Sequence, residues 1–198
     1  MHIEALIHLA KAAASLAPDK SFIVFGSSSA FGTFPNLADS VSTYEQTLDA
    51  DLVFEPLDEE TWSHLRAALG KESPFFESHG YYADINGPRA FECFPADFRD
   101  RLVPLADVPN VFAIEPNDMA VAKLIAGREK DVRLLSILLA GGYLNEAAIR
   151  TRLWNMEMSD KLIVKVDLTL KATITAARDL GYSVECPEQP WKMTAPTA

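Results

Sequence analysis

The 198-residue sequence has little of what secreted, zinc-binding and membrane proteins need. It has only two cysteines, Cys93 and Cys186, and its four histidines stand apart, so no zinc-ligand spacing occurs. A disulfide between the cysteines stays open from the sequence, although two cysteines without a secretory signal are most often reduced. No apolar run is long enough to span a membrane, and residues 1–11 alternate apolar with polar side chains. We therefore expect an amphipathic N-terminal helix, a cytoplasmic location and no membrane partner.

Positive charge is also scarce. The chain has 18 lysines and arginines against 28 aspartates and glutamates, which gives a net charge of −10. Proteins that bind long nucleic acids usually carry basic faces that displace counterions, so the composition argues against an extended duplex partner. A small RNA acceptor stays compatible, because a basic cluster occurs at Arg128, Lys130 and Arg133, with Arg150 and Arg152 further along. A cluster of this size is more often a solvated helix face.

Two alternating acids on an apolar strand are the most informative motif. In the stretch from Leu48 to Phe54, side chains alternate between the two faces, so Asp49 and Asp51 fall on the same one. Two carboxylates on one side of a rigid strand can bind Mg²⁺ or Mn²⁺ together with substrate phosphates. Taken alone, an alternating pair of acids is more often a solvated strand face.

An upstream turn strengthens the nucleotide interpretation. The sequence from Phe22 to Ser29 predicts a buried strand that ends at Gly26-Ser27 and continues into a helix. Free backbone N–H groups at a helix start attract phosphate, although an ordinary strand–helix connection has the same sequence pattern. Together with the two acids, the turn favours a site in which Gly26 and Ser27 hold the phosphates of a nucleotide.

A Gly-Ser turn followed by Asp-x-Asp resembles the nucleotidyltransferases of the DNA polymerase β type, which move a nucleoside monophosphate from an NTP to an acceptor. Two departures stand out. The spacing of 21 residues between Ser27 and Asp49 is longer than usual there, so an insert that begins with residues 31–36 is expected to form a loop. In the tRNA-modifying members an arginine closely follows the Gly-Ser turn, but no arginine closely follows Ser27 here.

A narrower resemblance covers most of the chain. The ordered motifs are Gly26-Ser27, Phe34-Pro35, Asp49-Ala-Asp51, residues 79–84, residues 98–105, residues 117–123 and residues 127–131. In this order they resemble uncharacterised bacterial nucleotidyltransferase-like proteins, which are similar to the toxins of abortive-infection (type IV) toxin–antitoxin systems. The resemblance implies that Lys123 and Asp131 bind nucleotide, with the lysine neutralising the triphosphate. On an unbroken helix Lys123, Gly127 and Lys130 would share one stripe, whereas a junction between two helices is the alternative.

A third acid is expected from the segment near residues 79–86. Alternation places Tyr82 and Asp84 on one side of this predicted strand. The resemblance implies that Asp84 is the third carboxylate, which shares the metal site and deprotonates or orients the acceptor hydroxyl. An aspartate at the end of a hairpin is an equally good interpretation of this position. Glu55 lies on the face of the two earlier acids but at the strand end, and ranks below Asp84.

The order of elements predicts an α/β (α+β) protein with a minimal nucleotidyltransferase fold. We expect a mixed, twisted sheet of four or five strands with helices, followed by a C-terminal helical bundle. The predicted strands are 21–26, 47–54, 79–86 and 111–115, with a hairpin partner near 89–94, and the predicted helices are 2–17, a short one near Ser27, 59–69, 117–126, 129–140, 145–154 and 159–181. The domain prediction is a core over 1–115, a helical region over 116–190 packed on it, and a loose tail over 191–198.

Two functions are compatible with these motifs. The first is a metal-dependent nucleotidyltransferase that uses an NTP and acts on RNA, a protein or a small molecule, with a relation to toxin–antitoxin systems. The second is a catalytically silent module of the same fold that holds nucleotide or a protein partner. A homo-oligomer is left open. Convergence of Ser27, Asp49, Asp51 and Asp84 would favour the enzyme.

Overall fold

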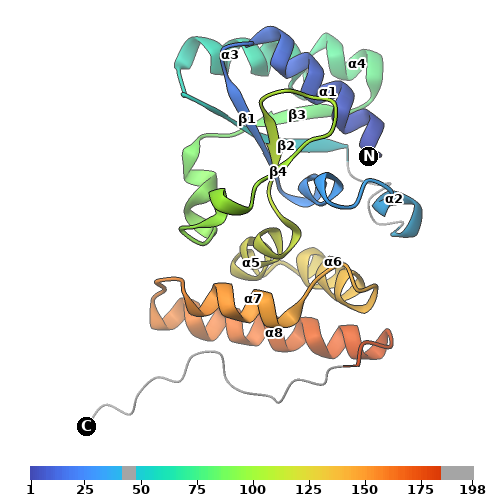
Figure 1. Cartoon of the computed structure of the whole chain (residues 1–198), viewed down its shortest axis with the longest axis vertical. Helices are drawn as coiled ribbons and strands as arrows, with labels where there is room; N and C mark the ends of the chain where they lie inside the picture. The colour runs from blue at the N-terminus through green and yellow to red at the C-terminus, as the bar shows by residue number, and fades with distance from the viewer. Residues whose placement is uncertain (42–47, 184–198) are drawn as a thin grey trace. The chain divides into compact units, whose positions relative to one another are not determined.

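The structure, a computed structural model, describes residues 1–41 and 48–183, which form two compact units (Figure 1). The N-terminal unit contains residues 1–92 and 97–115. The C-terminal unit contains residues 93–96 and continues from Pro116. Cys186 and the tail predicted over 191–198 lie outside the described residues.

The N-terminal unit is built around a mixed sheet, as the sequence predicts. Its five strands among the described residues have the order β3-β2-β1-β5-β4. Strand β2 is antiparallel to β1 and parallel to β3, while β5 is parallel to β1 and antiparallel to β4. The bounds are Ser21–Phe25 for β1, Asp49–Glu55 for β2, Tyr82–Ile85 for β3, Val103–Pro104 for β4 and Val111–Ala113 for β5.

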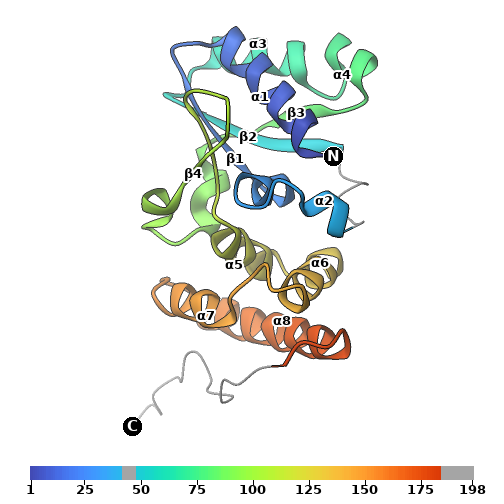
Figure 2. The ribbon, with the colours of Figure 1, turned by 45° about the vertical axis from the view of Figure 1, so that its right-hand side comes forward.

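One face of this sheet forms the apolar core. Phe22 pairs with Phe54 and Val24 with Leu52, and all four side chains are buried. Helix α1 (Ile3–Leu16) packs on helix α3 (Glu59–Leu69), and α3 packs on β3 (Figure 2). Ala50, Leu52 and Phe54 of β2 point to this core face, so Asp49 and Asp51, one position out of step with them, lie on the other face.

Helix α3 begins at the residue that the sequence predicts. The Thr61 N–H donates to the Asp58 carboxylate over 2.7 Å, which caps the helix. Lys20 also bonds to Asp58, over 2.8 Å. The Lys20 hydrogen bond, followed by those of Thr61, lowers the pKa of Asp58 from 3.8 to about 2. The cap therefore stays ionised well into the acidic range.

Two short helices differ from the predictions around β3. Helix α4 (Pro74–His79) occupies the start of the predicted strand 79–86, because Ser73 caps it and Gly80, at φ 75°, ends it. The expected hairpin partner near 89–94 is wrong, since residues 88–93 form the 3₁₀ helix η3 (Pro88–Cys93). Proline fixes φ near its helical value and lacks the N–H that a strand pair would use.

The insert after the Gly-Ser turn is partly helical, which corrects the loop prediction. A 3₁₀ helix, η1 (Ser27–Gly32), follows Gly26, and α2 (Leu37–Ser40) comes next. Phe31 and Leu37 are fully buried, so apolar burial fixes these turns. Residues 42–47 of the insert lie outside the described residues.

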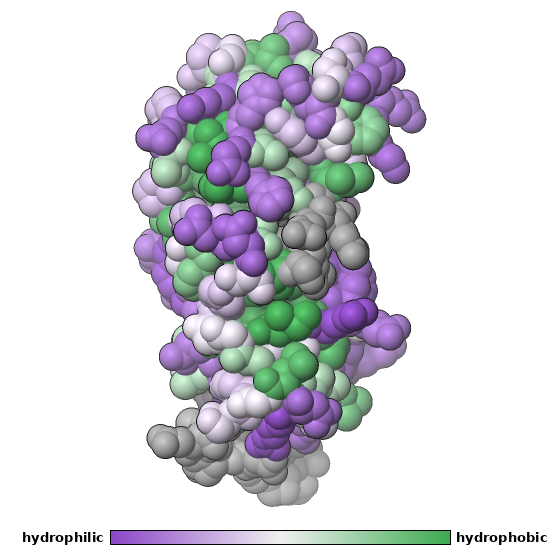
Figure 3. Space-filling model, turned by 90° about the vertical axis from the view of Figure 1, so that its right-hand side faces the viewer, coloured by the Kyte–Doolittle hydropathy of each residue, from purple (hydrophilic) through white to green (hydrophobic). Residues whose placement is uncertain are grey.

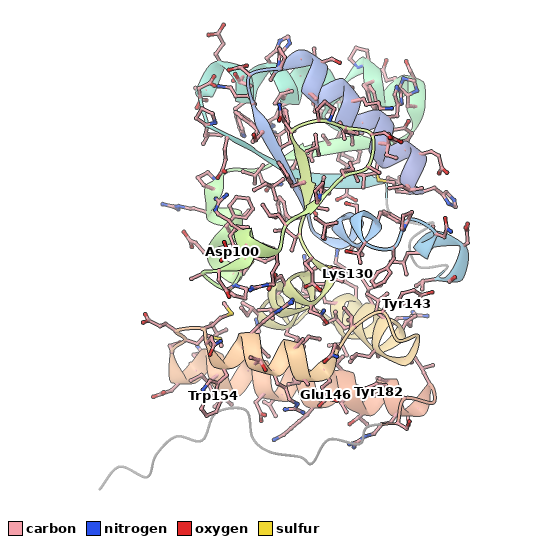
Figure 4. The ribbon with its side chains drawn as sticks, viewed as in Figure 1. Asp100, Lys130, Tyr143, Glu146, Trp154 and Tyr182 are labelled. Atoms are coloured by element: carbon pink, nitrogen blue, oxygen red, sulfur yellow. The ribbon has the colours of Figure 1, made fainter. Side chains whose placement is uncertain are left out.

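The C-terminal unit is helical, and its four main helices confirm the predicted ones to within two residues. They are α5 (Pro116–Ala126), α6 (Glu129–Ala140), α7 (Glu146–Trp154) and α8 (Asp160–Asp179). Asn145 and Ser159 cap the last two. Buried Glu146 accepts from Arg150 over 2.7 Å and from the Tyr182 hydroxyl over 3.3 Å (Figure 4), which ties the end of α8 to α7.

One face of the molecule shows how hydrophilic and hydrophobic residues are distributed on the surface. Hydrophilic residues cover much of the face shown in Figure 3, with smaller hydrophobic areas between them. In the part of the chain that the structure describes, no helix has the length and apolar character needed to cross a membrane.

Candidate active site

Three acids and a tyrosine occupy the corners of a rectangle on one face of β2 and β3. The strands are parallel, with Asp49 opposite Tyr82 and Asp51 opposite Asp84. Residues directly opposite each other in a sheet point to the same face, as do residues two apart along one strand. The structure therefore brings together the three acids that the sequence selects. The hairpin interpretation of Asp84 does not hold, because the residues after β3 form the 3₁₀ helix η3 and not a partner strand.

The acids are held rigidly but remain within reach of solvent. Asp49 and Asp51 are half-buried and Asp84 is exposed, whereas Ala50 and Ala83 between them are buried on the opposite face. Carboxylates on fixed strands are preorganised before an ion arrives, and their exposure leaves room for a cation and a substrate.

The pKa of the Tyr82 hydroxyl is affected by all three acids. Burial raises the pKa of the Tyr82 hydroxyl, and the carboxylates of Asp49, Asp84 and Asp51 raise this pKa further. A phenolate near three carboxylates would be a fourth negative charge, so the carboxylates disfavour it and raise the pKa. Three carboxylates thus lie near the Tyr82 hydroxyl.

Gly26 lies directly against the acids. Its φ is 67°, and an added Cβ would overlap the Asp51 carboxylate, so both backbone geometry and space require glycine there. The contact arises because Phe25 is the cross-strand partner of Asp51, which places the turn after β1 beside that acid. The predicted turn and the predicted acids therefore form one site.

The serines that follow Gly26 have different surroundings. Ser29 donates to the Gly26 carbonyl over 2.8 Å and fixes the turn. Ser28 is buried, and its hydroxyl has no hydrogen-bond partner within the described residues. Ser27 begins η1 and is half-buried, so it is the serine of the three that retains access to solvent.

Glu55 is paired with an arginine. Arg99 donates to both of its carboxylate oxygens, over 2.9 and 2.7 Å. The guanidinium also lies over the rings of Phe91 and Phe98, at 5.3 and 5.1 Å from their centres. The sequence alone does not point to Arg99, because nothing local links residues 44 positions apart.

The donor set fits a hard divalent cation that shares its ligands with substrate. Across residues 1–41 and 48–183, no group of three or more His, Cys, Asp or Glu side chains is arranged to hold a metal ion by itself. Mg²⁺ is usually bound through one or two carboxylates, with water and phosphate oxygens as the other ligands. The paired acids Asp49 and Asp51, with Asp84 beside them, match this open type of site.

Lys123 and Asp131 form a buried ion pair in the C-terminal unit. The Lys123 ammonium donates to Asp131 over 3.0 Å, and Arg128 donates to the same carboxylate over 2.6 Å. Burial raises the pKa of Asp131, but the hydrogen bond from Arg128 and the charge of Lys123 outweigh it, so the net pKa is lowered. The stripe proposed for an unbroken helix is wrong, because Gly127, at φ 64°, separates α5 from α6.

Most arginines of the basic cluster are neutralised by acids of the same unit. Arg128 pairs with Asp131 and Arg150 with Glu146, and Arg152 pairs with fully buried Asp118 over 3.3 Å. Lys130 is exposed (Figure 4). The pairing favours the structural interpretation of this cluster over a nucleic-acid surface.

A mixed sheet that sets a glycine turn against an Asp-x-Asp strand, with a third acid on the next strand, defines a nucleotidyltransferase-like α/β protein. The chain belongs to the family described as nucleotidyltransferase of unknown function (DUF6036), whose model matches residues 4–141. That range includes Gly26, the three acids and the Lys123–Asp131 pair. No curated protein and no solved structure matches the chain.

Proposed function

We propose that the protein is a metal-dependent nucleotidyltransferase that moves a nucleoside monophosphate from an NTP to an acceptor hydroxyl. The observation that carries the proposal is the placement of Asp49, Asp51 and Asp84 on one sheet face with Gly26 against Asp51. Family membership supports a function of the nucleotidyltransferase type. The metal, the substrate and the chemistry below are our proposals.

Each residue of the site has a proposed role. Asp49 and Asp51, with Asp84 beside them, would hold Mg²⁺ or Mn²⁺, which when bound offsets the negative charge of the triphosphate and of the leaving pyrophosphate. The backbone of Gly26 and the hydroxyl of Ser27 would hold the β- and γ-phosphates. Asp84, the most exposed acid, would accept the proton of the acceptor hydroxyl.

Lys123 and Asp131 are proposed to bind nucleotide, as the family resemblance implies. In the structure the ammonium of Lys123 is already neutralised by Asp131. Lys123 can therefore neutralise a triphosphate only if phosphate oxygens replace the carboxylate of Asp131. This internal pairing is also the observation that favours the second candidate function, a silent module that binds nucleotide or a protein without turnover.

The proposed acceptor is RNA, a protein or a small molecule. The paired arginines of the C-terminal unit argue against an extended duplex as the acceptor. From the resemblance in sequence we also propose a role in a toxin–antitoxin system and a cytoplasmic location. We further propose that the chain binds a protein partner or a second copy of itself.

Thermal melting tests whether the acids bind a metal–nucleotide complex. Mg²⁺ with NTP at a hundredfold excess over its Kd should stabilise the wild-type protein by about 2.7 kcal/mol, because the ligand binds only the folded state. For a chain of this length we expect a rise in Tm of about 5–11 °C. The double variant Asp49→Asn, Asp51→Asn should show no rise.

A matched control removes two acids elsewhere. Glu72→Gln with Asp179→Asn makes the same change in net charge at exposed positions away from the sheet, and should keep the full rise in Tm. An equal rise in the Asp49→Asn, Asp51→Asn variant would show that nucleotide binds at another place and would overturn the assignment of this site.

A further inference from the structure

Tyr82 occupies the fourth corner of the rectangle that the three acids define. It lies opposite Asp49 on the neighbouring strand and two residues before Asp84 on its own strand, so its side chain shares their face. The phenol interacts electrostatically with all three carboxylates. A hydroxyl group of the chain itself is thus built into the proposed site.

The length of the side chain places the hydroxyl where substrate would lie. A tyrosine hydroxyl lies further from its Cβ atom than an aspartate carboxylate oxygen does, and a cation bound to the carboxylates would lie about 2 Å beyond their oxygens. Cations on the carboxylates, and the phosphates bound to them, would therefore lie on the same side of the sheet as the Tyr82 hydroxyl.

The ring of Tyr82 is held in place. Phe76 of α4 packs against it edge to face, with ring centres 5.2 Å apart, and the residue is half-buried. Aromatic pairs of this geometry restrict side-chain motion. Its neighbour Tyr81 faces the other way, where its hydroxyl bonds to His8 Nδ1 over 2.7 Å and its ring packs on Phe75. The two adjacent tyrosines therefore differ in their access to the acids.

We propose that the Tyr82 hydroxyl is itself a nucleotidyl acceptor, so that the protein modifies its own Tyr82. This inference rests on the proposed function. The Tyr82 oxygen attacks the α-phosphorus of the bound NTP and forms the new oxygen–phosphorus bond. The bond from the α-phosphorus to the bridging oxygen breaks, pyrophosphate leaves with the electron pair, and the phenolic proton passes to Asp84. The product is a tyrosine–NMP phosphodiester, which occupies the site and blocks further acceptors.

Peptide mapping by mass spectrometry tests the proposal on the full chain. The wild-type protein is incubated with each NTP and Mg²⁺, with no other acceptor present. We expect one nucleotidyl group on Tyr82 in the wild type and in Tyr81→Phe, and none in Tyr82→Phe. Tyr82→Phe should keep the rise in Tm with Mg²⁺ and NTP, which shows that it is folded and binds nucleotide.

A second readout needs no turnover. With Mg²⁺ and an NTP analogue whose α,β-bridge is a methylene group, acetylation of Tyr82 by N-acetylimidazole should slow by about tenfold or more, because a phosphate bound on this side of the sheet covers the hydroxyl. Acetylation of Tyr81 should be unchanged. Equal acetylation of Tyr82 with and without the analogue would overturn the placement of its hydroxyl beside the phosphates.

The outcomes separate this inference from the proposed function. If the wild type labels another acceptor while Tyr82 stays unmodified, self-modification is wrong and the nucleotidyltransferase proposal stands. If Tyr82→Phe acquires the same label as the wild type, the acceptor is another residue. If nucleotide neither binds nor transfers, both proposals fall.

Discussion

Replacing Asp84 by asparagine is expected to lower nucleotidyl transfer by about a hundredfold or more, the lower range for loss of a general base. The amide has the size of the carboxylate but cannot take up a proton, while Asp49 and Asp51 remain to bind the cation. Binding of Mg²⁺ and NTP, measured by the rise in Tm, should therefore persist. The measurement is the initial rate of label transfer from an α-labelled NTP.

Asp100→Asn is the control for this variant. Asp100 is an exposed acid (Figure 4) in the motif of residues 98–105, and it lies outside the rectangle of β2 and β3. The Asp100→Asn variant should transfer the nucleotidyl group at the wild-type rate. If Asp84→Asn also transfers at that rate, Asp84 does not activate the acceptor; if it loses nucleotide binding as well, its main role is as a ligand for the metal.

Asp131→Asn is expected to destabilise the C-terminal unit by about 3–5 kcal/mol, the usual cost of removing one partner of a buried ion pair. The Asp131 side chain is 1% exposed and that of Lys123 is 9% exposed, so the lysine would be left charged and poorly solvated. Urea unfolding followed by circular dichroism measures the loss. Asp167→Asn, which removes a surface pair with Lys171, should cost less than about 1 kcal/mol.

The same pair predicts how this difference depends on pH. Because the folded-state pKa of Asp131 is lowered from 3.8, its contribution to stability is fully present above that value and is lost as pH falls through the folded-state pKa. The gap in unfolding free energy between wild type and Asp131→Asn should therefore be constant near neutral pH and narrow below pH 3.8. A gap that stays unchanged in acid would show that charge pairing is not the cause.

The helices could be predicted because their signals are local. Asp58 starts α3 by capping its first turn, and Asn145 and Ser159 do the same for α7 and α8. The acids of β2 could be placed on one face because strand alternation depends only on neighbouring residues. Short elements were harder: α4 and η3 each span six residues, too few for an apolar period to become visible.

The contacts that complete the site depend on the tertiary fold. The close approach of the Asp51 carboxylate to Gly26 follows from the register of β1 against β2, and the bond of Arg99 to Glu55 joins segments far apart in sequence. No local pattern encodes either contact. Likewise, the sequence places Lys123 and Asp131 near each other but cannot show that both are buried and paired.

The most direct test of the central claim is transfer of a nucleotidyl group by the wild-type protein. The full chain is incubated with each α-labelled NTP, Mg²⁺ and total RNA or protein extract, with Asp49→Asn as the inactive control. We predict a labelled acceptor and release of pyrophosphate in equal amount, both absent from the control. If the wild type binds nucleotide with Mg²⁺ but labels nothing above the control, in the extracts or on itself, the protein is a nucleotide-binding module and not a nucleotidyltransferase.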